Sequence, residues 1–217
     1  MRARTADGSR RPPGSGRLRL VRTHLRLYAA INAGAYGLFV VGFLLGLVVP
    51  ELSADRAQSL EDDGTGALVR RLVETPPLFA ATILGVNVVR LGLMTIVLPS
   101  LVIPFAGLVA FAWWSVQTGI TLVPAAPAGW VALIPHSLTV LIELQAYVLL
   151  LLGAALLGRA WVQPASVAAG TRREAYLRGL QHLGRLATAA VCLLVVGAVW
   201  EAVSLRYLVR PLQLMLL

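Results

Sequence analysis

The chain has 217 residues, of which 58% are hydrophobic and only 13% are charged, and its mean hydropathy is +0.77. A soluble domain normally carries about 25% charged residues. A chain this apolar cannot cover its surface with polar groups, so lipid must surround most of it. The composition therefore excludes a soluble enzyme, a disordered chain and a secreted disulfide scaffold. The single cysteine, Cys192, excludes an intrachain disulfide.

The net charge of +9 comes entirely from Arg, because the chain contains no Lys. Eight Arg precede residue 27 and lie beside a hydrophobic segment, a pattern that usually sets membrane topology. Residues 1–26 therefore predict a cytoplasmic arm, which we expect to be disordered because it is rich in Arg, Gly, Pro and Ser. No basic fold with interleaved aromatics is present, so we expect no nucleic-acid partner.

Five stretches reach the length of about 20 apolar residues that a spanning helix needs. They are residues 27–49, 79–98, 100–122, 131–158 and 186–208. Pro99, Ser100 and Pro104 predict a tight turn or kink between the second and third stretches. The first stretch exceeds the roughly 7–15 apolar residues of a cleaved signal peptide, which favours an uncleaved anchor. The sequence thus predicts an all-α, polytopic membrane bundle with a single membrane domain over residues 27–212.

The distribution of Arg predicts the orientation of this bundle. Segment 50–78 has six acidic residues and three Arg, whereas segment 159–185 has five Arg and one Glu. Because positive loops stay in the cytoplasm, the N-terminus and segment 159–185 should lie inside, and segment 50–78 and the C-terminus outside. We therefore expect a multi-pass protein of the bacterial cytoplasmic membrane; the Arg-only usage, together with abundant Ala, Gly, Leu and Val, indicates a GC-rich genome.

Both segments outside the membrane contain helical patterns. The outer segment predicts short helices over 53–62, with Ser53 as a candidate N-cap, and over 65–75, ended by Pro76-Pro77. Its Glu61-Asp62-Asp63-Gly64 run lacks the ligand spacing of a calcium loop, which favours a solvated acidic turn. The inner segment predicts an amphipathic interfacial helix over 171–185 that runs into the fifth stretch.

The inner helix has a clear start signal and a predicted apolar face. Thr171 and Glu174 have the spacing of a capping box. The apolar residues that recur at helical spacing are Tyr176, Leu177, Leu180, Leu183 and Ala187. Membrane anchoring is the simpler role for this helix, and docking of a protein partner is the alternative.

Ionisable and amide side chains are rare inside the predicted spans, where they usually face other helices or a cavity. They are Asn87, Arg90, His136, Glu143 and Glu201. At about 1.5 Å per residue, Arg90 and Glu143 lie at matching depths and predict an ion pair. We expect all five side chains to form one intramembrane polar cluster that joins three helices and lies toward the outer half of the membrane.

Several chemistries fit such a cluster. A hydrogen-bonded network that fixes helix packing is the simplest, and a relay for protons or ions is a second. A divalent metal is a weak third, with His136, Glu143 and Glu201 as candidate ligands, because His136 and Glu143 lie about 10.5 Å apart along one helix. Ser137 and Cys192 are weak nucleophile candidates without a recognisable base. We assign no catalytic residue and no required cofactor.

Small residues are frequent in the spans, and Gly42-Phe43-Leu44-Leu45-Gly46 is a small-xxx-small motif that permits close helix contact. This motif indicates either packing within the chain or association into a homo-oligomer.

Three motifs resemble those of the stage II sporulation protein M family of five-span bacterial membrane proteins. They are the Asn-containing run Ile83–Arg90, the Pro-His…Glu run Pro135–Leu144, and Val199-Trp200-Glu201-Ala202. The motifs occur in the family order, and the resemblance covers roughly residues 27–212. The family usually has a second Asn at the position of Val86 and Gly at that of Ser137.

The resemblance implies a non-enzymatic membrane scaffold that recruits envelope or peptidoglycan-remodelling partners. Some relatives lie in gene clusters for circular bacteriocins, which implies the alternative of a transport, maturation or export factor for a peptide or small substrate.

Overall fold

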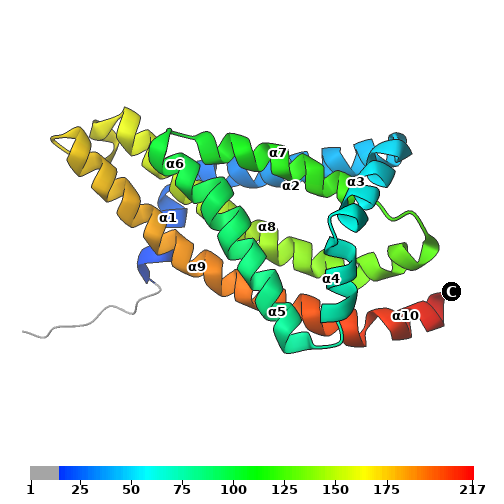
Figure 1. The fold of residues 1–217 in the computed structure, drawn as a ribbon. Coiled ribbons are helices and arrows are strands. Elements are labelled where there is room, and N and C mark those ends of the chain that lie inside the picture. The colour runs from blue at the N-terminus through cyan, green and yellow to red at the C-terminus, as the bar shows by residue number, and fades with distance from the viewer. Residues whose placement is uncertain (1–14) are drawn as a thin grey trace, which may run out of the picture.

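The computed structural model describes residues 15–217, which fold into long helices with no strand among them (Figure 1). Four helical stretches are long and apolar enough to cross a membrane: α2 (Leu25–Val48), Pro76–Val102, α8 (Pro127–Val162) and α9 (Arg172–Tyr207). Their exposed surfaces carry many large apolar side chains, as lipid contact requires. The prediction of an all-helical membrane protein is confirmed.

The third predicted stretch, 100–122, divides between two helices. Its first residues belong to α6 (Leu98–Val102), the chain turns at Ile103–Phe105, and α7 (Ala106–Thr121) follows with 16 residues. At about 1.5 Å per residue α7 is about 24 Å long. It lies beside α2 along its length (Figure 1).

The stretch Pro76–Val102 is one continuous run that changes its winding. It begins as α5 (Pro76–Gly85), continues as the π-helix η1 (Val86–Val97) and ends as α6. The Thr95 hydroxyl donates to the Arg90 carbonyl five residues back, at 2.9 Å. Because a π-helix is wound with i→i+5 hydrogen bonds, side chains within η1 point in directions that a regular α-helix would not give them.

Helices α2 and α7 approach closely because glycines face their contact. A Cβ at Gly42 would collide with the Val116 backbone, and one at Gly119 would collide with the Phe39 backbone. The buried Ser115 hydroxyl also donates to the Ala35 carbonyl at 3.0 Å. Within this chain, the Gly42–Gly46 motif therefore serves packing against α7.

Helix α8 forms the centre of the bundle. In its most apolar window 67% of the residues are buried, against at most 33% in the other candidate spans. It packs mainly against α9, where Gly153 faces Leu183 and Gly179 faces Leu157. A helix buried on most sides is apolar all round, so polar residues on α8 must find partners inside the protein.

The cap at Thr171 is confirmed. The Thr171 hydroxyl accepts from the Glu174 N–H at 3.2 Å, and Glu174 Oε2 accepts from the Gly170 N–H at 3.0 Å. The helix continues past residue 185 as α9, in agreement with an inner helix that runs into the fifth predicted stretch. Leu177 and Leu180 of its predicted apolar face lie exposed on the surface of the bundle, where an interfacial helix would contact lipid. The buried stripe begins at Ala175, Gly179 and Leu183.

The outer segment forms α3 (Pro50–Asp62) and α4 (Thr65–Leu72). Ser53 is not the N-cap, because α3 begins at Pro50, whose fixed φ suits a first helical turn. Pro76-Pro77 opens α5 rather than ending α4, for the same reason. Leu72 of α4 packs against Phe79 of α5 and Ala202 of α9, which attaches α4 to the bundle.

The arm predicted as disordered over residues 1–26 is partly helical. Helix α1 spans Ser15–Thr23, and His24 separates it from α2. The remainder of that prediction, residues 1–14, lies outside the described residues. The chain also forms the short helix η2 (Pro164–Val167) and ends with α10 (Val209–Leu216).

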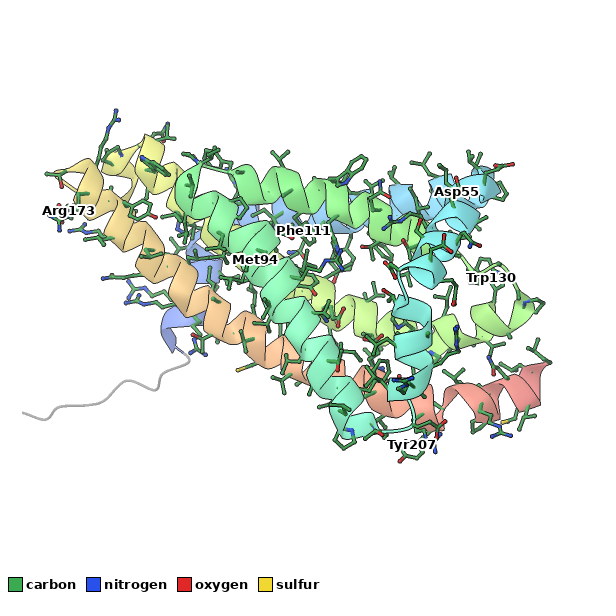
Figure 2. All side chains as sticks on the ribbon, in the orientation of Figure 1. Asp55, Met94, Phe111, Trp130, Arg173 and Tyr207 are labelled. Carbon is green, nitrogen blue, oxygen red and sulfur yellow. The ribbon has the colours of Figure 1, made fainter. Side chains whose placement is uncertain are left out.

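The bundle has two chemically different ends. At the basic end, the start of α2 meets the α8–α9 connection, and the Tyr176 hydroxyl donates to the Leu101 carbonyl of α6 at 3.1 Å. At the opposite end, Arg206 pairs with Glu74 at 2.8 Å. Figure 2 shows Arg173 at the basic end and Asp55 and Tyr207 toward the other.

Candidate functional site

The first half of the polar cluster joins η1 to α8. The Asn87 side-chain amide donates to Glu143 Oε1 in a short hydrogen bond. Gly197 of α9 faces the stem of Glu143, and a Cβ at this glycine would lie 3.2 Å from Glu143 Cγ. The absence of a side chain at Gly197 therefore leaves the space that Glu143 occupies.

The second half joins α8 to α9. His136 Nδ1 lies 3.6 Å from Glu201 Oε1, and these side chains keep only 21% and 16% of their surface exposed. The neighbouring Trp200 Nε1–H donates to the Pro135 carbonyl at 3.0 Å. Pro135 interrupts the backbone hydrogen bonds of α8 because it has no N–H, and Trp200 fastens α9 to the helix at this point.

Two cavities meet at His136. The inner cavity has a volume of about 90 Å³, and the residues that line it include His136, Glu143 and Tyr147. The other cavity has a volume of about 280 Å³ and is lined by His136 and Glu201 together with residues that include Pro124 and Gly129, at the end of the bundle opposite the basic end. His136 therefore lies between an inner carboxyl group and a cavity at the bundle end, and we call this arrangement the carboxylate cavity.

Tyr147 is a further polar residue of the carboxylate cavity that sequence reasoning missed. Its side chain is fully buried against Phe111 and Trp114. Its hydroxyl makes no hydrogen bond to any described residue. Since buried hydroxyls are almost always paired, this unpaired group is an exception among the buried polar atoms of the described residues. A Tyr four residues after Glu143 would have been the only signal in the sequence.

Arg90 does not join the cluster, which corrects the predicted ion pair with Glu143. Its side chain is exposed, and it forms no ion pair with a described residue. Its charge acts instead on Asp63, whose pKa lies below its ordinary value first because Thr65 donates hydrogen bonds to it and then because Arg90 and Arg56 are near. Depth along a helix cannot specify direction around it, and the π-helical winding of η1 changes that direction.

The metal candidates do not form a metal-holding group. Among residues 15–217 no cluster of three His, Cys, Asp or Glu side chains has a suitable arrangement. Glu143 and Glu201 instead lie beside separate partners, Asn87 and His136. The weak nucleophile candidates lie apart as well: the Ser137 hydroxyl donates to the Ile134 carbonyl, and Cys192 is exposed.

A second polar network, between α2 and α8, was also missed. Gln145 accepts from the Tyr28 hydroxyl at 2.8 Å and donates to Asn32 Oδ1 at 2.6 Å and to the Tyr36 hydroxyl at 3.0 Å. Tyr28, Asn32 and Tyr36 recur every four residues, which places them on one face of α2. This spacing was the available signal. The side chains of this network hydrogen-bond to one another and thereby hold α2 against α8.

No protein-family model, curated protein or solved structure matches this chain. The resemblance to the stage II sporulation protein M family therefore depends on the three sequence motifs alone. Asn87, the pair His136 and Glu143, and Glu201 come from these three motifs, and all four side chains lie at the carboxylate cavity or against it.

Proposed function

We propose that this protein crosses the bacterial cytoplasmic membrane five times, with its N-terminus inside and its C-terminus outside. The supporting observation is the path of α7. It starts beside α6, whose Leu101 meets Tyr176 near the basic end, and Thr121 at its other end accepts from Arg56 of α3 at 3.4 Å. α7 thus runs between the two ends although it is short, and a slightly thinned bilayer accommodates such a helix.

The charges of the two ends support the same orientation. The described part of the N-terminal arm and the α8–α9 connection bring Arg17, Arg19, Arg22, Arg26, Arg159, Arg172, Arg173, Arg178 and Arg185 to the basic end. Glu174 is the acidic residue among them. Clusters of Arg near span ends remain in the cytoplasm, so the carboxylate cavity opens outward.

Within this membrane protein, the carboxylate cavity is proposed to carry protons or a small cationic substrate. The single observation behind this is that Glu143 and Glu201 line two neighbouring cavities that share His136 in their linings, and no Arg among the described residues pairs with either carboxyl group. An ionised carboxylate away from water is costly unless a cation or several donors face it. Entry of a proton or a cation would therefore lower the free energy of the site, which a purely structural network would not need.

Proton flux into proteoliposomes tests this proposal. The purified protein is reconstituted with a pH-sensitive dye inside, and a voltage is imposed with potassium and valinomycin. Wild-type vesicles should acidify faster than empty ones. Glu143→Gln should abolish the difference, because the amide can still accept from Asn87 but cannot exchange a proton. Equal rates in wild-type and empty vesicles would rule out proton transport.

The matched control is Glu51→Gln on the exposed surface of α3, which should leave the flux unchanged. Thermal unfolding of each variant separates loss of function from loss of folding. If Glu143→Gln lowers the unfolding temperature but leaves the flux of the folded fraction intact, the carboxyl group serves packing.

A second candidate function is the scaffold that the family resemblance implies. The observation that favours it is the outer surface of α3, where Glu51, Leu52 and Asp55 are exposed together. Such a mixed acidic and apolar surface fits an envelope protein partner better than lipid. A Glu51→Gln, Asp55→Asn double variant should then lose cross-linking to peptidoglycan-remodelling enzymes in cells while proton flux persists; undiminished cross-linking would exclude this surface.

A further inference from the structure

A third cavity lies at the basic end, apart from the carboxylate cavity. Its volume is about 400 Å³, and it is surrounded by His24, which separates α1 from α2, and by residues of α8, η2 and α9. We call it the basic-end cavity; its lining residues are His24, Leu156, Arg159, Ser166, Val167, Arg178, Gln181 and His182. Hydrogen-bond donors dominate this lining, and it contains no carboxylate.

The two arginines of the basic-end cavity have different roles. The Arg178 guanidinium donates to the Val167 and Ala168 carbonyls at 2.6 and 3.0 Å and pairs with Glu174, so it holds the α8–α9 connection in place. Arg159 forms no ion pair and no side-chain hydrogen bond with any residue in 15–217. Its charge is therefore uncompensated within the described chain.

Two imidazoles add further polar groups. His182 Nδ1 is buried without a hydrogen-bond partner among the described residues. His24 also lines the cavity, and the charge of Arg159 reaches His24. The His182 ring lines the same cavity as the unpaired guanidinium of Arg159, so both residues can offer polar groups to one ligand.

We propose that the basic-end cavity binds a phosphate group, held by Arg159 and by His182 with Gln181 and Ser166 as further donors. A guanidinium matches phosphate oxygens in a two-point hydrogen-bonded geometry. Basic cavities between membrane helices on the cytoplasmic side are suited to anionic lipid headgroups. The phosphate belongs either to such a headgroup or to a free phosphate compound, and the same side chains serve both.

Titration of the purified full-length protein with three probes tests the proposal. The probes are dioctanoyl phosphatidylglycerol, dioctanoylglycerol, which lacks phosphate, and inorganic phosphate, each followed by calorimetry. Phosphatidylglycerol should bind in a saturable way and dioctanoylglycerol should not. Saturable binding of inorganic phosphate as well would identify a free phosphate compound as sufficient, whereas its failure to bind would identify the lipid headgroup.

Arg159→Gln should weaken binding of the phosphate-bearing probe roughly tenfold, the effect of losing one charge-assisted hydrogen bond. The matched control is Arg173→Gln, an exposed arginine of the same end that does not line the cavity. The proposal is overturned if neither phosphate probe saturates, if dioctanoylglycerol binds as well as phosphatidylglycerol, or if the two variants weaken binding equally. Because Arg159 is exposed, its replacement should preserve folding, which thermal unfolding checks.

Discussion

The hydrogen-bond partner of a carboxyl group inside a helix bundle is the donor that lies nearest to it, and this donor can be charged or neutral. Glu143 was expected to pair with Arg90 because the two lie at similar depths, yet its partner is the neutral Asn87. Arg90 lies three residues after Asn87 and is exposed. Residue type and depth therefore identified Asn87, His136, Glu143 and Glu201 as members of the site, but the direction of each side chain decided which pairs formed.

At the residue scale, the pKa of His24 should respond to Arg159. This pKa lies below the ordinary value of 6.5, first because burial penalises the imidazolium and second because Arg159 repels it. Arg159→Gln should therefore raise the pKa of His24 toward its ordinary value, without fully restoring it because burial remains. A histidine ¹⁵N NMR titration in phosphate-free buffer measures the shift.

The sign of the linked stability follows from the same comparison. Because unfolded His24 binds a proton more readily than folded His24, its protonation destabilises the protein as pH falls below about 6.5. Arg178 and His182 of α9 line the same cavity. The histidine resonances of His182 are therefore followed in the same titration. An unchanged or lower pKa for His24 in the variant, with Arg173→Gln as control, would contradict the assigned role of Arg159.

At the element scale, helix contacts depend on which glycines face a neighbour. Gly42 and Gly119 lie at the α2–α7 contact, whereas nothing lies within 4 Å of a Cβ built at Gly34 or Gly37. The sequence motif pointed to Gly42 and Gly46 but did not identify α7 as their partner. In the same way, the capping box predicted the start of α9 and the sequence predicted that it runs into the fifth stretch, whereas its packing against α8 at Gly153 and Gly179 became evident only from the structure.

Alanine at Gly42 and at Gly34 should therefore have opposite effects. Gly42→Ala places a methyl group against the Val116 backbone and should destabilise the protein by about 1–3 kcal/mol, as overpacking does. Gly34→Ala meets open space and should be neutral or stabilising by up to about 1 kcal/mol, because Ala favours the helix. Thermal unfolding in detergent, followed by circular dichroism, compares the two. Equal destabilisation would mean that α2 and α7 do not pack as closely as described.

At the scale of the whole molecule, the number of crossings depends on α7. Four helical stretches meet the length and hydropathy required of a span, and α7, with 16 residues, is shorter. Length alone would give four crossings. The contacts at the two ends of α7 favour five. These two possibilities place the α8–α9 connection on opposite sides of the membrane.

Cysteine labelling distinguishes five crossings from four. In a Cys192→Ser background, Gln58→Cys on α3 should react with a membrane-impermeant maleimide in intact spheroplasts. Arg173→Cys should react only after permeabilisation, because five crossings keep it in the cytoplasm. If α7 does not cross, both cysteines would react from outside. Labelling of Arg173→Cys alone would instead reverse the proposed orientation.

The sequence by itself determined what depends on composition and on local chain properties. These are the all-helical membrane class, the approximate positions of four long helices, the cap at Thr171, and the ionisable and amide side chains within the spans that need partners inside the protein. Only the tertiary structure decided the π-helical winding of η1, the exposure of Arg90 and the roles of Tyr147 and Gln145. The physical reason is that hydropathy and spacing describe one helix at a time, whereas the partner of a buried polar group is chosen by the rotation and close approach of neighbouring helices.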